Sequence, residues 1–231
     1  MKKYLTLGLA VIITLAATAA TPTPASAQSA GLVSSIINRM ERNRRDLKSL
    51  RASISMEKYD AQIRDPDKRV GTLLYIPGAG KNQAVRVDWR SPQETLAVVD
   101  GQYTLLRQRM KIAYKGDANS GKATKVNSIL GFGLNVSQAQ LKSSFDMQYI
   151  GEEALWGGVQ VSHMKLVPKG KAGYSYAEVW VDGAGMPVQT KVVERNGDAT
   201  TVRLMDVQRN VQLSKNDFKL DLGADIKRVR G

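Results

Sequence analysis

Hydrophobic residues recur at spacings of three and four from Ser29 to about Lys48, and this pattern predicts one amphipathic helix. The apolar positions of this helix are Leu32, Val33, Ile36, Ile37, Met40 and Leu47. Arg39, Arg42 and Arg45 fall on the opposite side. These arginines form either a solvated face or a face that docks to lipid or to a receptor.

After Leu50 the apolar positions alternate with polar ones, which is typical of antiparallel strands with one apolar face. Val85, Val87 and Trp89 point one way in such a strand, while Arg86 and Asp88 point the other. The same alternation continues at Leu96, Val98, Tyr103 and Leu105. Asp100-Gly101 lies between these two pairs and is a two-residue hairpin signal.

Further strands are predicted along most of the remaining chain. Their ranges are 112–115, 145–150, 159–167, 174–181, 188–195, 201–207, 218–222 and 226–229. Turn signals separate them at Gly157-Gly158, Lys169-Gly170, Asp182-Gly183 and Asn196-Gly197. The pattern therefore predicts about a dozen short strands in one long meander and an α+β fold class.

The segment from 117 to 144 interrupts this meander. A helix of roughly 20 residues spans only about 30 Å, which is too short to cover the apolar face of so many strands. Further apolar side chains are supplied by Ile129, Leu130, Phe132 and Leu134, and Ser137 is a predicted N-cap. We therefore expect two short helices against the sheet, linked through the two glycines of LGFGLN (130–135).

The first 27 residues have the layout of a Sec-type signal peptide. Lys2 and Lys3 precede an apolar run at 5–20, and Ala25-Ser26-Ala27 has the small-x-small pattern of a cleavage site. We expect cleavage after Ala27, export to the periplasm and a single domain over residues 28–231. Removal of 27 of the 231 residues leaves 204, enough for a sizeable core.

Charge and cysteine content narrow the class of partner. The formal net charge of +13, or +11 without the two lysines of the signal, favours acidic partners such as anionic lipid headgroups or nucleic acid. Export makes nucleic acid the poorer candidate, so we expect no nucleic-acid partner. The chain has no cysteine, which excludes disulfides, thiolate zinc sites and lipid attachment at a cysteine.

No catalytic or metal-binding pattern stands out. The single histidine, His163, lies in a predicted strand without a second ligand nearby, and no G-x-S-x-G elbow accompanies it. The stretch GAGK (78–81) lacks the spacing of a phosphate loop and is interpreted as a hairpin loop. The carboxylate pairs Glu152-Glu153 and Asp65/Asp67 fall in predicted turns, where solvated charge explains them. We expect no enzyme, no metal and no cofactor.

Five short motifs occur in an order that is typical of one protein family. The first two are VRVDWRSP (85–92) and LAVVDGQ (96–102). The later three are KLVPK (165–169), EVWVDG (178–183) and FKLDL (218–222). Together they make the chain resemble the periplasmic outer-membrane lipoprotein carriers, the LolA family, over essentially its whole mature length.

The resemblance implies a strongly curved antiparallel β half-barrel of about eleven strands. Its apolar concave face would be closed by the N-terminal helix and by short central lid helices. In that family the cavity carries lipoprotein acyl chains from an inner-membrane exporter to an outer-membrane acceptor, and we expect a monomer that does the same. Two alternatives stay open, namely a carrier of another lipid and a lipoprotein-sensing accessory module of the same fold.

Two groups of residues are expected to contact the cargo. The cavity would be lined by Val85, Val87, Trp89, Leu96, Val98, Tyr103 and Leu105. The underside of the lid would be formed by Ile129, Leu130, Phe132 and Leu134. For both groups the alternative is ordinary core, either of a filled barrel or of a fixed segment packed against it.

The chain departs from the family at the closing latch of the lid. Family carriers commonly place an arginine just before the proline of the third strand, where it hydrogen-bonds the lid. Here Ile76 precedes Pro77. Arg86 on the next strand is a candidate substitute, although its alternation with Val85 and Val87 points it outward. Closure would then depend mainly on burial of Phe132 and its neighbours.

Overall fold

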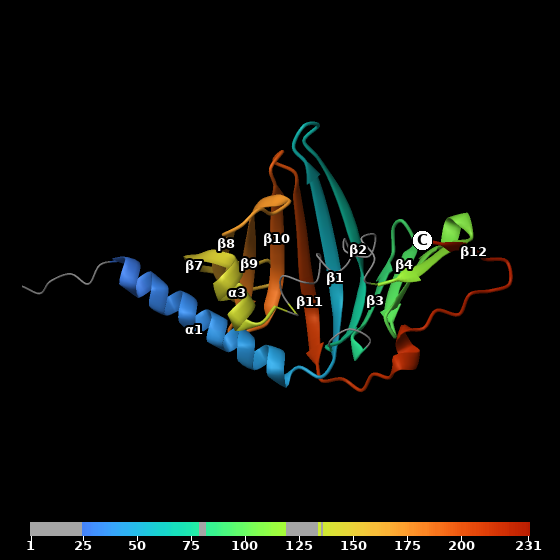
Figure 1. Ribbon diagram of the computed structural model, residues 1–231, viewed down its shortest axis with the longest axis horizontal. Coiled ribbons are helices and arrows are strands. Elements are labelled where there is room, and N and C mark those ends of the chain that lie inside the picture. Colours follow the sequence, from blue (N-terminus) through green and yellow to red (C-terminus); the bar gives the residue numbers. More distant parts are fainter. Residues whose placement is uncertain (1–24, 79–81, 119–133, 135) are drawn as a thin grey trace, which may run out of the picture.

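The computed structural model describes residues 25–78, 82–118, 134 and 136–231, with side chains from Ser29 onward (Figure 1). It consists of an N-terminal helix, α1 (Ala25–Asp46), and one large sheet of twelve strands. The helix begins four residues before the predicted Ser29, and the predicted signal peptide up to residue 24 lies outside the described residues. Among the described helices, none is both long and apolar enough to cross a membrane.

The strands follow one another as a meander, and the described part of the chain has three short helical elements between them. They are β1 (Leu50–Asp60), β2 (Asp65–Ile76), β3 (Ala84–Trp89), β4 (Glu94–Val99), β5 (Gln102–Arg107), β6 (Ile112–Asp117), β7 (Phe145–Leu155), β8 (Val159–Pro168), β9 (Tyr174–Asp182), β10 (Pro187–Glu194), β11 (Ala199–Arg209) and β12 (Lys227–Arg230). The helical elements are η2 (Gln108–Met110), α3 (Gln138–Ser144) and η3 (Lys215–Phe218).

The strand order across the sheet is β12-β6-β5-β4-β3-β2-β1-β11-β10-β9-β8-β7. Every neighbouring pair is antiparallel except β12 and β6, which are parallel. Because β12 and β7 form the two ends, the sheet is not closed. The α+β class is thus confirmed. The sheet has twelve strands, where the alternation predicted about a dozen and the family resemblance implied about eleven, while the strong curvature stays a prediction.

Alternation along each strand gathers the apolar side chains on one face, which we name the inner face. Leu73 pairs with Val87, Val87 with Leu96, and Leu96 with Leu105. Residues paired directly across strands point to the same side, so this row of four shares one face. A slip of one residue would turn all of them to the opposite, outer face, and burial therefore determines the register.

The Asp100-Gly101 hairpin has the backbone that its sequence predicts. Both residues have positive φ angles, 53° and 76°, as a type I′ turn requires. The turn joins β4 to β5 and sets Val98 opposite Tyr103 on the inner face. This local signal therefore positions two of the predicted cavity residues.

Helix α1 covers the inner face of the half of the sheet that contains β7 to β10 (Figure 1). Its apolar stripe packs on strands β8 and β9 in a group that we name the second cluster. The buried members from α1 are Val33, Ile36, Ile37 and Met40, and those from the strands include Met164, Leu166, Ala177, Val179 and Val181. The predicted amphipathic helix is confirmed, and its apolar face is buried except at Leu32, which is 46% exposed.

A glycine in the turn between β9 and β10 permits the close approach of α1. Gly185 has a φ of +85°, and a Cβ built on it would lie 2.3 Å from the carbonyl oxygen of Arg39. Both the backbone conformation and the contact exclude an ordinary side chain at this position. The turn is further held by Arg209, whose Nη2 lies 2.9 Å from an Asp182 carboxylate oxygen.

The segment after β11 lies on the outer face of the other half of the sheet, beyond β3 and β4 (Figure 1). Residues 218–222 were predicted as a strand, and this prediction is wrong. Ser214 and Asp217 form a capping box that starts η3, which ends at the fully buried Phe218. Ile226 and the partly buried Leu220 and Leu222 then pack with Leu106 and Ala113. We name residues 214–226 the outer strap, because this segment crosses the outer face of the sheet. Its apolar residues are buried against the sheet, which explains their strand-like spacing.

The central segment is described only in part. The predicted N-cap Ser137 is confirmed, because its hydroxyl accepts from the Gln140 backbone N–H at 3.2 Å and the Gln140 side chain accepts from the Ser137 N–H at 2.9 Å. Helix α3 that follows buries Leu141. The other predicted helix lies outside the described residues.

Two carboxylate pairs were predicted to lie in turns, and the structure corrects both. Glu152 and Glu153 belong to β7, whereas Asp65 and Asp67 belong to β2. These strands extend beyond their apolar alternation because backbone pairing with β8 and β1 continues to their ends. The ends of these strands carry polar residues with no apolar alternation, so the sequence pattern did not show where the strands begin and end.

Candidate functional site

The seven predicted cavity residues come together on the inner face of β3, β4 and β5 within one apolar group, named the first cluster. Its buried members among them are Val85, Val87, Leu96, Val98 and Tyr103. Trp89 and Leu105 are partly buried and pack against the group. The adjacent strands β1 and β2 extend the cluster with side chains such as Ile54, Leu73 and Tyr75. The shared face is established, and contact with cargo stays a prediction.

Of the four predicted lid residues, the structure describes one. Leu134 is buried, with 4% of its surface exposed, and belongs to the first cluster. Ile129, Leu130 and Phe132 lie outside the described residues. The position of Leu134 fits both a lid that rests on the inner face and a fixed core segment, so the lid also stays a prediction.

Arg86 lies on the outer face, as its alternation with Val85 and Val87 predicted. Its guanidinium contacts the Asp88 carboxylate at 2.9 Å and donates to the backbone carbonyl of Asp217 at 3.0 Å. Arg86 therefore holds the C-terminal segment against β3. It is not the substitute latch for a lid on the inner face.

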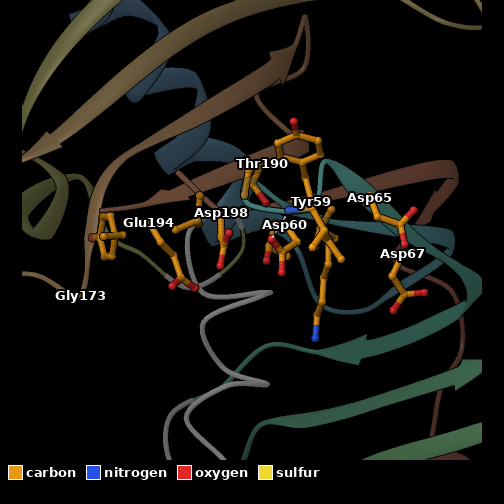
Figure 2. A pocket seen from close by; sticks show the side chains of 15 residues that line it. Tyr59, Asp60, Asp65, Asp67, Gly173, Thr190, Glu194 and Asp198 are labelled. Atoms are coloured by element: carbon orange, nitrogen blue, oxygen red, sulfur yellow. Dashed lines mark hydrogen bonds between the residues drawn. The ribbon is translucent and has the colours of Figure 1, made fainter. Parts of the chain in front are cut away.

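A pocket of about 620 Å³ opens at the ends of β1, β10 and β11, and we name it the acidic pocket (Figure 2). It is lined by Lys58, Tyr59, Asp60, Ile63, Asp65, Asp67, Gly173, Tyr174, Thr190, Val192, Glu194, Asp198, Ala199, Thr200 and Val202. Val202 also belongs to the first cluster, and Val192 packs against the second. The pocket therefore adjoins both apolar groups of the inner face, although it shares no residue with the seven predicted positions.

Carboxylates dominate the polar lining of the acidic pocket. Figure 2 shows Asp60 and Asp198 between Glu194 on one side and Asp65 and Asp67 on the other. Lys58 is the one lysine or arginine among the lining residues. The site thus has a local charge opposite to that of the whole chain.

Backbone contacts hold two of these carboxylates in place. Asp60 Oδ1 accepts from the backbone N–H groups of Gln62 and Ile63 at 2.8 and 3.2 Å, which forms the turn between β1 and β2. Asp198 Oδ1 accepts from the backbone N–H of Ala61 at 2.9 Å and so ties that turn to the β10–β11 turn. The two hairpin ends therefore form one wall.

Two uncharged polar side chains, Thr190 and Tyr174, also line the pocket. Thr190 has only 9% of its surface exposed, and its hydroxyl makes no hydrogen bond to any described residue. Burial raises the pKa of Tyr174, so its phenol stays neutral at ordinary pH. Sequence reasoning missed this pocket, and the signal that could have pointed to it was the grouping of Asp60, Asp65 and Asp67 within eight residues of the chain.

The predicted arginine side of α1 is partly engaged with the protein itself. Arg39 Nη2 donates to the buried Ser162 hydroxyl on β8 at 2.9 Å. Arg44 contacts Glu41 at 2.7 Å, and Glu41 also accepts from the Gln138 backbone N–H at 3.1 Å. The hydrogen bond from Arg44 lowers the pKa of Glu41 to about 2. Glu41 thereby links α1 to the start of α3.

Comparison with known proteins identifies a family and a fold. The family described as "Outer membrane lipoprotein carrier protein LolA" matches residues 45–221. No curated protein sequence matches the chain at a significant level.

Three solved structures are similar to this chain in fold. An uncharacterized conserved protein from Thermus thermophilus is 13% identical with a TM-score of 0.55, covering 87% of this chain and 99% of that one. MucB is 14% identical with a TM-score of 0.56, covering 85% of this chain and 65% of that one. A lipoprotein-sorting protein domain from Vibrio parahaemolyticus, named as putative in its description, is 14% identical with a TM-score of 0.41, covering 84% and 97%. At these identities the first two similarities establish the fold alone.

Proposed function

Because the chain belongs to the LolA family of outer membrane lipoprotein carrier proteins, we propose that it carries lipoprotein acyl chains from the inner to the outer membrane. Proteins of this family are carriers and not enzymes. The acyl chains would lie against the first cluster on the inner face, where the seven predicted cavity residues gather. Val87 and Leu96 would contact them most directly, because these two residues form the centre of the apolar row from Leu73 to Leu105.

The observation that carries this proposal is the continuity between a large apolar face and an open pocket. Twenty buried residues form the first cluster, and one of them, Val202, also lines the acidic pocket of about 620 Å³. That volume falls in the range of small-molecule binding pockets. Burial of an acyl chain recovers about 0.8 kcal/mol per CH₂, so even part of one chain outweighs a moderate cost of opening.

The cellular setting follows from the family and from the predicted signal peptide. A periplasmic carrier must receive its cargo from an inner-membrane exporter and deliver it to an outer-membrane acceptor. The net charge of +13, or +11 without the two lysines of the predicted signal, supports approach to anionic membrane surfaces on both sides. Association with anionic vesicles is expected to weaken toward about 0.5 M salt, where the Debye length is only a few ångströms.

The test is native mass spectrometry of the protein purified from its own periplasm without detergent, followed by organic extraction of the bound lipid. Copurified acylated protein supports the proposed carrier. A free lipid without protein supports the alternative of a carrier for another lipid. Absence of any bound acyl group, together with no uptake of added fatty acid, would contradict acyl binding altogether.

A further inference from the structure

On the premise of the proposed function, we propose that the acidic pocket selects cargo in which a positive charge directly adjoins the acyl chain. The tail would lie along the inner face, and an amine or guanidine group would sit among the carboxylates at the mouth. This goes beyond acyl binding, because it assigns a charge preference to the carrier and locates it at named residues.

The first support is the balance of charge in the pocket. Among the described residues, no basic side chain forms an ion pair with Asp60, Asp65, Glu194 or Asp198. Only Asp67 has such a partner, because Arg69 Nε lies 3.3 Å from its carboxylate. Lys58 alone offsets the remaining four negative charges from within the lining. A cationic ligand would supply the missing counter-charge.

The second support is independent of charge. Thr190 is more than nine-tenths buried, lies on the inner face opposite Val179 and Val202, and lines the pocket. Its hydroxyl makes no hydrogen bond to any described residue, and its oxygen is open to the pocket. A hydroxyl that lines the pocket without a partner among the described residues is suited to accept a hydrogen bond from an ammonium or guanidinium group.

The third support is the apolar path that leads away from the carboxylates. Val192 and Val202 connect the pocket to the second and first clusters respectively. Tyr59 and Tyr174 also line the pocket. The pocket is therefore amphipathic in the same order as the proposed ligand, with a charged mouth followed by an apolar interior.

The charge of the whole chain makes the proposal sharply testable. At +13 the protein attracts anions at long range, so general electrostatics predicts a preference for an anionic amphiphile. The local pocket predicts the opposite preference. Binding of dodecylammonium, dodecanol and dodecanoate, each below its micelle concentration, can be measured by displacement of a fluorescent fatty acid analogue at pH 7. We expect the amine to bind about tenfold more tightly than the carboxylate.

A double variant with a charge-matched control identifies the residues responsible. Asp65→Asn with Glu194→Gln removes two pocket carboxylates, and Asp146→Asn with Asp225→Asn removes two exposed ones elsewhere. Both variants raise the net charge by two. The first is expected to reduce the preference for the amine to about threefold or less, and the second to leave it unchanged. Thr190→Val is expected to weaken the amine without affecting dodecanol.

A second arm identifies the source of the positive charge. A lauroylated peptide with lysine next to the acylated residue is compared with the same peptide carrying glutamate. Preference for the lysine peptide points to the basic segment of an acylated protein, and preference for the alkylamine alone points to a lipid headgroup. Equal or tighter binding of dodecanoate by the unmodified protein would overturn the charge preference while leaving the carrier function intact. Failure of all three dodecyl probes to bind would instead contradict the carrier function.

Discussion

The two halves of the sheet are stabilised from opposite sides. Over β7 to β10, α1 packs on the inner face and buries the second cluster. Over β3 to β6, the C-terminal segment packs on the outer face, with Phe218 and Ile226 buried there. The inner face of β3 to β5 is also buried, and the first cluster there includes Leu134 of the central segment. These strands are therefore packed on both faces, and the exchange of cargo at the first cluster stays a prediction.

The largest effect is expected from a substitution that weakens the packing of the outer strap on the sheet. Phe218→Ala is expected to lower the free energy of unfolding by about 3 to 5 kcal/mol, because it empties a fully buried site. Chemical denaturation measures this loss. Trp156→Ala is the matched control, since this aromatic side chain is 83% exposed and its removal is expected to change stability by less than about 0.5 kcal/mol.

The same Phe218→Ala variant tests whether the strap has a purely supporting role. Its affinity for a fluorescent fatty acid, measured well below the unfolding transition, is expected to equal that of the unmodified protein. A large loss of affinity in the folded variant would show that the outer segment also shapes the inner face, and the division between the two faces would then be wrong.

A second substitution addresses the half that α1 covers. Gly185→Ala is expected to cost about 1 to 3 kcal/mol, because it forces a residue with Cβ into a positive φ and against the Arg39 carbonyl. Thermal unfolding detects the change. Gly183→Ala in the same turn is the control, since a Cβ added there would meet no atom within 4 Å. Equal stability of the two variants would contradict the proposed packing.

A third test introduces the same negative charge on the inner face and on the outer face, and compares the effect of each on fatty-acid affinity. Val87→Glu places a carboxylate in the first cluster, and fatty-acid affinity is expected to fall at least about tenfold. Val70→Glu places it at a position that is 47% exposed on the neighbouring strand and is expected to leave affinity unchanged. Circular dichroism verifies that both variants fold. Val87→Thr, which keeps the side-chain volume, replaces the glutamate variant if that one unfolds.

The smallest expected effect concerns the junction of α1 and α3. The pKa of Glu41 falls from 4.5 to about 2 in the folded protein, so its contribution is complete above about pH 4.5 and is lost as the pH falls toward 2. Glu41→Gln is therefore expected to flatten the dependence of the unfolding temperature on pH between about 4.5 and 2. An identical pH profile for both proteins would show that the Arg44 pair contributes nothing.

Several features of the fold follow from local sequence alone. The spacing of Ile36, Ile37 and Met40 determines which face of α1 is buried, because a helix repeats every 3.6 residues. Alternation over Val85 and Val87 determines which side chains share a face in β3, because successive side chains of a strand point to opposite faces. Asp100-Gly101 and the Ser137 cap are also local, since each is formed by neighbours in the chain. The shared face of the seven predicted cavity residues is thus a property of the sequence.

Other features depend on how distant strands are ordered, and periodicity carries no information about that order. The strand-like spacing of 218–222 could not distinguish a strand from a strap on the outer face, because both bury alternate residues. The parallel pairing of β12 with β6 depends on the path of that strap around the sheet. The acidic pocket depends on the order β1-β11-β10, which brings Asp60 beside Asp198 and Thr190 across more than a hundred residues. Its charge arises from juxtaposition in space, and only the tertiary structure decides it.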